Sequence, residues 1–238
     1  MRKIGICFSL IVLLASCNAP RQTTSPETNT QAQATTDGLV AYYTFEGNGK
    51  DQVGTYHAKP YKGVPLKFEY VDQTHKRALN FSIAEQSRAV IDNTFDYEHK
   101  TICLRVKADV IDANPAVVFV SDNPRKQYGL AGVVMKEEEG EKKLFFNLAS
   151  NPVGVPVSEG QWYHVALVGA ARSYAYYLNG SLIAKGPINQ YKSSSKGAVA
   201  TILGSSRIFS IFFSGSIDDL RVYNRALTAE EIAVIAKN

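Results

Sequence analysis

The feature that most restricts the fold is a series of short β-prone runs, separated by turn signals, that begins at Gly38. In the run from Leu66 to Tyr70, apolar and polar side chains alternate at the period of a half-buried strand. The strongest turn signal is Asn179-Gly180, because both central positions of a type I′ hairpin turn need a positive φ. Only the last segment has helical character. About a dozen short strands and one terminal helix predict an all-β sandwich of two antiparallel sheets.

The last of these runs cannot be a regular strand. Ile217, Leu220 and Val222 are its apolar residues, and their spacing does not place them all on one face, since side chains alternate sides with a period of two. We therefore predict a β-bulge near Asp218 and Asp219. Two adjacent carboxylates at an irregular point of a strand favour a structural or ionic role.

The segment that follows predicts the short C-terminal helix. Thr228 and Glu231 have the spacing of a capping box, in which each side chain binds the other residue's backbone amide. Leu227 and Ile232 flank the box at the spacing of a hydrophobic staple. The helix is therefore expected to fold back onto the sheet that contains the terminal strand.

The N-terminal residues predict export rather than folding. Residues 1–16 form a signal peptide, with Arg2 and Lys3 ahead of an apolar run that is too short to be a permanent membrane span. The sequence Leu14-Ala-Ser-Cys17 resembles the bacterial lipoprotein box, which implies that Cys17 is lipidated and that the protein is anchored to a bacterial cell membrane, inner or outer. An ordinary signal peptide with an incidental cysteine is the alternative. Residues 17–37 then form the lipidated cysteine and a disordered tether, because they are rich in Thr, Gln, Asn, Ala and Pro.

Composition argues against a disulfide-stabilised domain and against a nucleic-acid-binding protein. Beyond Cys17 the chain has only Cys103, so no disulfide can form within the domain of residues 38–238 and stability must come from its core. The formal charge of +4 falls to +2 when Arg2 and Lys3 are removed, which argues against nucleic acid as a partner. The lipid anchor is the only membrane contact that we predict.

Three motifs resemble one known family. They are the opening segment from Gly38 to Asp51, the central Trp162-Tyr-His-Val-Ala166 with its Tyr177-Leu-Asn-Gly180 hairpin, and the terminal segment from Gly215 to Ile232. Their order and spacing resemble a laminin-G-like domain of the concanavalin A-like lectin and glucanase superfamily. The resemblance implies a jelly-roll of two antiparallel sheets in which the first and last strands meet.

The superfamily includes glycoside hydrolases, which need two carboxylates on either side of the scissile bond. Its laminarinase-type members carry three acidic residues at alternate positions of one strand, and no predicted strand here does. The acidic run from Glu137 to Glu141 is interpreted as a hairpin tip. His164 is interpreted as a strand histidine with a local hydrogen bond, and Trp162 as a core residue rather than a sugar platform. We therefore predict no catalytic residues and no enzymatic activity.

The resemblance also implies a calcium site. Related domains hold calcium between the loop after the first strand and the terminal motif, which corresponds here to Asp51 and Asp218. Calcium takes carboxylate and backbone carbonyl oxygens, so this pair is chemically suitable. The alternative is that the two aspartates cap turns or pair with Lys50 and Arg221.

Ligand binding is expected in loops, where aromatic rings have polar neighbours suited to sugars and peptides. The candidate residues in such stretches, beside His57, are Tyr56, Tyr61, Tyr97, Tyr128 and Tyr191. A second candidate patch is the polar face of the strand Thr101 to Lys107, which carries Cys103, Arg105 and Lys107 and is expected to meet solvent or ligand.

The functional hypothesis is a non-catalytic envelope lipoprotein that binds a glycan or glycoprotein. The alternative is a structural, assembly or adhesion scaffold that docks on another envelope protein, because sandwiches of this type serve both purposes.

Overall fold

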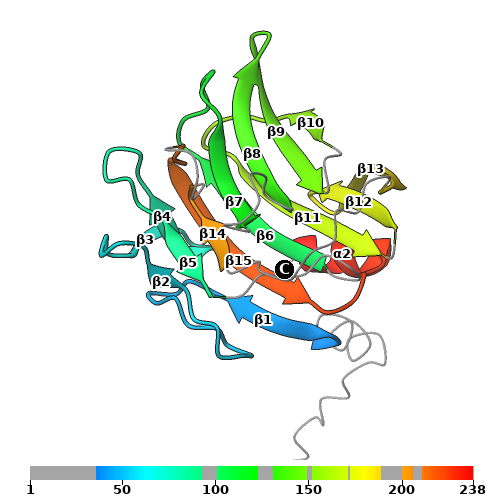
Figure 1. Cartoon of the computed structure of the whole chain (residues 1–238), viewed down its shortest axis with the longest axis horizontal. Helices are drawn as coiled ribbons and strands as arrows, with labels where there is room; N and C mark the ends of the chain where they lie inside the picture. The colour runs from blue at the N-terminus through cyan, green and yellow to red at the C-terminus, as the bar shows by residue number, and fades with distance from the viewer. Residues whose placement is uncertain are drawn as a thin grey trace, which may run out of the picture.

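The computed structural model describes residues 36–92, 101–122, 131–148, 152–170, 172–188, 200–205 and 211–237, which form a sandwich of two antiparallel sheets (Figure 1). No helix in these ranges has the length and apolar character needed to cross a membrane. The predictions for residues 1–35, including the signal peptide and the lipidation of Cys17, lie outside the described residues.

The larger sheet, sheet A, has the strand order β13-β12-β11-β6-β15-β4-β3, and β1 pairs with β15 beyond the end of β4. The terminal strand is thus central to sheet A, and the first and last strands meet as predicted. The bounds of the strands of sheet A are β1 (Leu39–Tyr43), β3 (Lys67–Asp72), β4 (Lys76–Phe81), β6 (Thr101–Ala108), β11 (Trp162–Ala170), β12 (Ser173–Leu178), β13 (Ser181–Pro187) and β15 (Gly215–Tyr223).

The smaller sheet, sheet B, has the order β10-β9-β8-β7-β14-β5-β2. Its inner face packs on that of sheet A, and large side chains such as Phe119, Phe146 and Tyr176 fill the space between them. The bounds of its strands are β2 (Lys59–Pro60), β5 (Ala89–Ile91), β7 (Ala116–Asp122), β8 (Ala131–Glu138), β9 (Glu141–Leu148), β10 (Val153–Pro156) and β14 (Ala200–Leu203).

Most turns follow the sequence signals. Asn179 and Gly180 both have a positive φ in the β12–β13 hairpin, and Glu139 and Gly140 do so at the acidic β8–β9 tip. The strand predicted for Ile208 to Phe213 was wrong in its described part, where Phe212 makes one isolated bridge to Ser205. The short edge strands β2 and β10 were not predicted, because each contains a proline.

The bulge of β15 lies where the sequence placed it. The register between β15 and β6 shifts between Asp218 and Arg221, and Asp219 has a φ of 49°. The extra residue lets Ile217 and Leu220 both enter the core, and it turns the two aspartates toward the outer face of sheet A.

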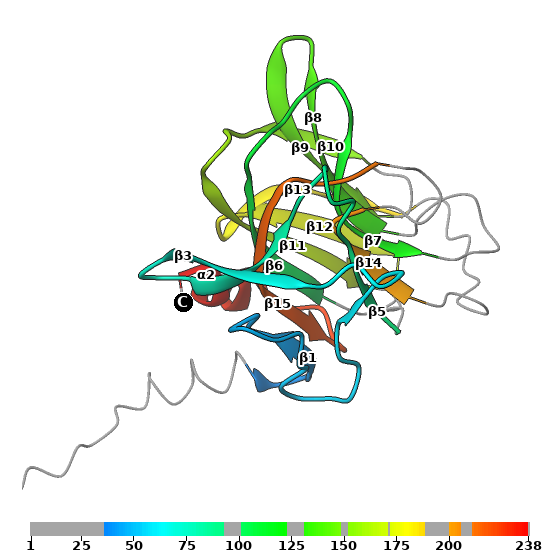
Figure 2. The ribbon, with the colours of Figure 1, turned by 90° about the vertical axis from the view of Figure 1, so that its left-hand side faces the viewer.

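The helix α2 (Ala229–Lys237) lies on that outer face, on the side of sheet A turned away from sheet B (Figure 2). The capping box forms, since the Thr228 amide donates to Glu231 Oε2 at 2.8 Å and the Glu231 amide donates to Thr228 Oγ1 at 3.3 Å. Ile232 and Ile235 are buried on the sheet. The cluster beneath the helix also contains Cys103, Ala166, Val168, Tyr177, Tyr223 and Leu227.

Candidate functional site

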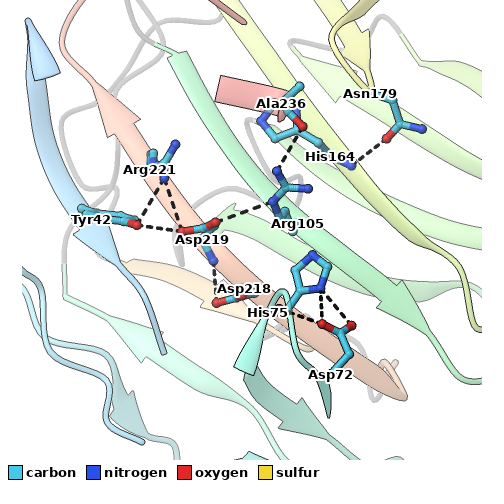
Figure 3. A network of polar contacts seen from close by, with 10 residues as sticks. All are labelled: Tyr42, Asp72, His75, Arg105, His164, Asn179, Asp218, Asp219, Arg221 and Ala236. Carbon is cyan, nitrogen blue, oxygen red and sulfur yellow. Dashed lines mark hydrogen bonds and ion pairs between the residues drawn. The ribbon is translucent and has the colours of Figure 1, made fainter. Parts of the chain in front are cut away.

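The helix covers only part of the outer face of sheet A, and the part beside it is polar. The two bulge aspartates lie there in different surroundings. Asp219 Oδ1 accepts a hydrogen bond from the Tyr42 hydroxyl at 2.8 Å and lies 3.4 Å from Arg221 Nη2, while its Oδ2 lies 3.6 Å from Arg105 Nε. Figure 3 shows Asp219 at the centre of this network. The charge of Asp219 is therefore fully compensated by protein groups.

Asp218 is buried more deeply, with 4% of its surface exposed. Its Oδ1 accepts a hydrogen bond from the Asp219 amide at 2.8 Å, and no donor among the described residues binds its Oδ2. Burial first, and then the negative charges of Asp219 and Glu46, raise the pKa of Asp218 to about 8. One carboxyl oxygen of Asp218 is thus left without a protein partner and stays accessible to water.

The turn between β3 and β4 closes the other side of this area. Asp72 accepts hydrogen bonds from the amides of Thr74 and His75 at 2.8 and 2.7 Å, and its carboxylate pairs with His75 Nδ1 at 2.9 Å. Burial alone would raise the pKa of Asp72, but these bonds from His75 and Thr74 lower it to about 2.

Trp162 of β11 holds the turn against the sheet. Its Nε1 donates to Asp72 Oδ2 at 3.1 Å, and its ring stacks on the His75 ring with the centroids 4.3 Å apart. The Lys107 ammonium lies 5.4 Å from the same ring. The prediction that Trp162 is a core residue was wrong, because it lies half-buried on the outer face and is occupied by the turn rather than by the core.

Between the turn and the bulge lies a hollow of about 260 Å³, which we call the outer cavity. Its walls come from β1 and the residues after it, the β3–β4 turn, β6 and β15. Three carboxylates and two cationic side chains line it. The lining residues are Tyr42, Thr44, Glu46, Thr74, His75, Lys76, Arg105, Asp218 and Asp219.

The sequence of this fold matches one family model, described as the concanavalin A-like lectin/glucanases superfamily, over residues 84–233. The chain belongs to this lectin/glucanase superfamily. The match contains β6, β11 and β15, the strands that carry Arg105, Trp162 and Asp218. No curated protein matches the chain.

Solved structures share the fold at low sequence identity. Domain 4 of AbnA, a GH43 extracellular arabinanase from Geobacillus stearothermophilus, in complex with arabinotriose, has a TM-score of 0.66 and 19% identity over 83% of this chain and 98% of that one. The botulinum neurotoxin serotype D binding domain has a TM-score of 0.61 at 13% identity, over 87% of this chain and 52% of that one. The Trypanosoma rangeli sialidase in complex with the inhibitor DANA has a TM-score of 0.64 at 17% identity, over 84% of this chain and 33% of that one.

This protein therefore spans about half of the toxin chain and a third of the sialidase chain. At these identities the likeness shows the shared sandwich fold. The fold occurs both in glycoside hydrolases and in proteins that are not enzymes, so the site must be argued from its own residues.

The structure does not bring the two predicted calcium ligands together. Asp51 Oδ1 accepts hydrogen bonds from the amides of Tyr42 and Val53, both at 3.0 Å, on the edge of β1 that faces away from β15. Asp218 lies on the other side of β1. Asp51 thus organises the loop after β1, which is the alternative role that the sequence left open.

The outer cavity also has few ligands for calcium, which takes six to eight oxygens. The described ranges contain no group of three or more His, Cys, Asp and Glu side chains arranged to hold a metal ion. Calcium binding stays a prediction that this geometry does not favour.

Two of the five candidate tyrosines lie in the part of the chain that the structure describes, and they lie beside different sheets. Tyr56 is 46% exposed in the loop after β1, and Tyr61 lies beyond β2 of the other sheet, with the Arg88 guanidinium 4.5 Å from its ring. Tyr97, Tyr128 and Tyr191 lie outside the described residues.

The candidate face of β6 divides into three environments. Cys103 is fully buried under α2, where burial raises the pKa of its thiol to about 12, so the prediction that it meets solvent or ligand was wrong. No pattern in the sequence indicates which part of the sheet the helix covers, so the burial of Cys103 could not be inferred. Arg105 lines the outer cavity and donates from Nη2 to the Ala236 carbonyl at the end of α2. Lys107 lies over Trp162.

His164 lies on the face of β11 that alternation predicted, together with Trp162 and Ala166, and is 3% exposed. Its backbone amide donates to Asn179 Oδ1 at 2.9 Å, but neither ring nitrogen has a hydrogen-bond partner among the described residues. Burial, followed by the nearby positive charges of Arg105 and Arg221, lowers the pKa of His164 to about 3. It is a neutral packed side chain rather than a locally bonded one.

Sequence reasoning missed several residues of the site, among them Tyr42, Asp72 and His75. The pattern Asp72-Gln-Thr-His75 was a usable signal, since an aspartate often accepts bonds from amides two and three residues later. No sequence signal linked that turn to Trp162, which lies 90 residues away.

A second depression, of about 530 Å³, lies beside the start of α2. We call it the apolar groove, because small and apolar side chains form most of its surface. Its lining residues are Val168, Ala170, Ser173, Tyr174, Ala175, Tyr177, Lys185, Gly186, Ala226 and Leu227.

Proposed function

We propose that this lectin/glucanase-family chain is a non-catalytic glycan-binding module, exported and held at the cell envelope through a lipid on Cys17. The outer cavity is the proposed binding site. The observation that carries this proposal is the largely buried Asp218 side chain, whose Oδ2 has no protein partner and lies beside the cavity. Because this oxygen is accessible from the cavity, a ligand that donates a hydrogen bond to it can replace water there.

The lining of the cavity suits a sugar. Sugar hydroxyls both donate and accept hydrogen bonds, and the cavity offers carboxylates, the Thr44 and Thr74 hydroxyls and the Lys76 ammonium. The His75 ring is held rigid by Trp162 and Asp72 and adds an aromatic wall. A volume of about 260 Å³ lies below the usual range for drug-sized ligands and fits one monosaccharide residue at the end or side of a glycan.

The comparisons add support through the fold. The arabinanase domain was solved with arabinotriose, and a botulinum neurotoxin serotype D ligand-binding domain with N-acetylneuraminic acid, at a TM-score of 0.62 and 13% identity. Both structures contain carbohydrate, and this chain matches 98% of the arabinanase domain and 52% of the toxin chain. Neither assigns a sugar to this chain.

The state of Asp219 supports a binding role over hydrolysis. A glycosidase needs one carboxyl group as acid and a second as base or nucleophile, each free to act. Both oxygens of Asp219 are already engaged by Tyr42, Arg221 and Arg105. The two remaining carboxyl groups of the cavity come from different elements, and no described strand carries the alternating acidic pattern of the hydrolytic relatives.

The test is a glycan array probed with the full-length protein, with Thr74→Val as the site variant and Glu141→Gln at the distant β8–β9 tip as the matched control. We expect reproducible hits that weaken several-fold in Thr74→Val and persist in Glu141→Gln. Silence across the array would overturn the glycan-binding function. Release of reducing ends from a bound glycan would replace binding by hydrolysis.

The apolar groove favours a second candidate, a scaffold that docks on another envelope protein. Leu182 on the edge strand β13 is also 46% exposed, which extends apolar surface in this region. A Leu182→Lys variant that loses a co-purified envelope protein, with an array that stays silent, would support the scaffold over the glycan-binding module.

A further inference from the structure

The charge in the outer cavity is unevenly compensated. Asp219 has three protein partners, so its charge is matched. Arg105 is likewise engaged, by Asp219 and by the Ala236 carbonyl. Two carboxyl groups remain without a described ion-pair partner, those of buried Asp218 and of exposed Glu46. The floor and one wall of the cavity therefore offer hydrogen-bond acceptors that the protein itself leaves unused.

Lys76, the other cationic residue of the lining, does not donate to these unused acceptors. Lys76 lies at the exposed start of β4, where its backbone has a φ of 46°, and none of the described acidic side chains forms an ion pair with it. An exposed ammonium is well solvated by water and does not give Asp218 Oδ2 a hydrogen bond. The Asp218 oxygen thus faces a space that is open to a donor from outside.

We propose that the group which fills this position is the ammonium of an amino sugar, bound between Asp218 and Glu46. This inference rests on the proposed glycan-binding function and names its ligand class. An ammonium has three N–H donors, which match Asp218 Oδ2, the Glu46 carboxylate and the Thr44 hydroxyl that line the same cavity. The positive charge of an ammonium favours the ionised form of Asp218, and hydrogen bonds between charged groups are about twice as strong as neutral ones, so the amine contributes both affinity and selectivity.

The geometry distinguishes an amine from the other ligands. An N-acetylated sugar presents one amide N–H and a bulky acyl group, and it carries no positive charge to place between the two carboxyl groups. A plain hydroxyl donates one hydrogen bond and carries no charge. Calcium would need six to eight oxygens, which these side chains do not supply. The rigid His75 ring, stacked on Trp162, stands beside the position and presents an aromatic edge to the sugar ring.

The experiment compares monosaccharides in matched series. Glucosamine, N-acetylglucosamine and glucose, and the same three forms of galactose, are titrated into the full-length protein and followed by ligand-observed NMR. Binding of each amine at an affinity about tenfold or more above both of its counterparts is expected. Asp218→Asn and Glu46→Gln should each remove most of that preference, while Glu141→Gln should keep it. Thermal melting confirms that each variant is folded.

The outcomes separate this inference from the proposed function. If neutral or N-acetylated sugars bind as well as the amines, or Glu46→Gln and a folded Asp218→Asn keep the preference, the ammonium site is overturned and glycan binding stands. If neither these sugars nor the glycan array shows binding, both fail. If Nα-acetyl-lysine amide binds as tightly as glucosamine, the donor is a protein lysine and the amino-sugar assignment is overturned. If calcium alone binds and amines do not compete, the cavity is a metal site.

Discussion

The outer face of sheet A has two halves built on the same strands with opposite chemistry. In the covered half, under α2, β6 and β15 contribute Cys103 and Tyr223, which are buried among apolar side chains. In the open half, the same strands contribute Arg105 and Asp218, which are opposite each other in the β6–β15 pairing and line the outer cavity. The difference teaches that the sheet only sets the positions of these side chains. Cover by the helix decides which of them are buried in an apolar cluster and which line a polar cavity.

The largest effect is expected where the covered half is opened. Replacing Ile232 by alanine removes a fully buried side chain between α2 and the sheet, so we expect a loss of about 2–5 kcal/mol in the free energy of unfolding. Urea denaturation measures it. The exposed Ile83 is the matched control, and its alanine variant should change stability by less than about 0.5 kcal/mol. A similar small loss in both variants would show that the helix does not cover the sheet.

The next largest effect lies in the open half. Trp162→Ala removes the ring that stacks on His75 and the donor to Asp72, and we expect a loss of about 2 kcal/mol together with the loss of glycan binding. The Thr74 and His75 amides, which donate to Asp72, should exchange hydrogen faster. Trp162→Phe keeps a stacked ring and should be intermediate. Unchanged hydrogen exchange at these amides in Trp162→Ala would show that the β3–β4 turn is stable without Trp162.

The third prediction uses pH at the border between the halves. His164 has a folded-state pKa of about 3, below its unfolded value near 6.5, so the unfolded state takes up the proton first and stability falls as pH falls below 6.5. Relative to His164→Leu, the wild type should lose about 1.4 kcal/mol between pH 7.5 and 5.5. Parallel curves for the two proteins in urea would contradict the burial of a neutral imidazole.

The smallest effect concerns the loop after β1, outside both halves. Asp51→Ala removes the acceptor for two backbone amides and should cost about 1 kcal/mol. Because Asp51 and Asp218 do not meet, this cost should be the same with excess calcium and with a chelator. A calcium-dependent melting temperature that both Asp51→Asn and Asp218→Asn abolish would instead restore the predicted calcium site.

The fold was largely predictable because it depends on local signals. The β15 bulge followed from the spacing of Ile217, Leu220 and Val222, and the capping box of α2 from Thr228 and Glu231. Alternating apolar residues and paired turn residues identified most strands. These features involve neighbours in the sequence, whose geometry is fixed by the backbone alone.

The candidate site was predictable only in part, because it joins distant segments. Asp218 was singled out, but its predicted partner Asp51 is kept away by the intervening strand β1. The stacking of His75 on Trp162 and the ring of partners around Asp219 depend on which strands become neighbours. That pairing is a property of the whole chain, and no local pattern encodes it.

The position of β15 has a consequence for the time at which the cavity appears. This strand, close to the end of the chain, pairs with β6 on one side and with β1 and β4 on the other. The two parts of sheet A are therefore not joined until residues 215–223 are in place. Contacts between such distant segments form slowly, since a long loop must close first. The outer cavity is therefore completed last during folding, and a chain cut short before Gly215 lacks the strand that carries Asp218 and Asp219.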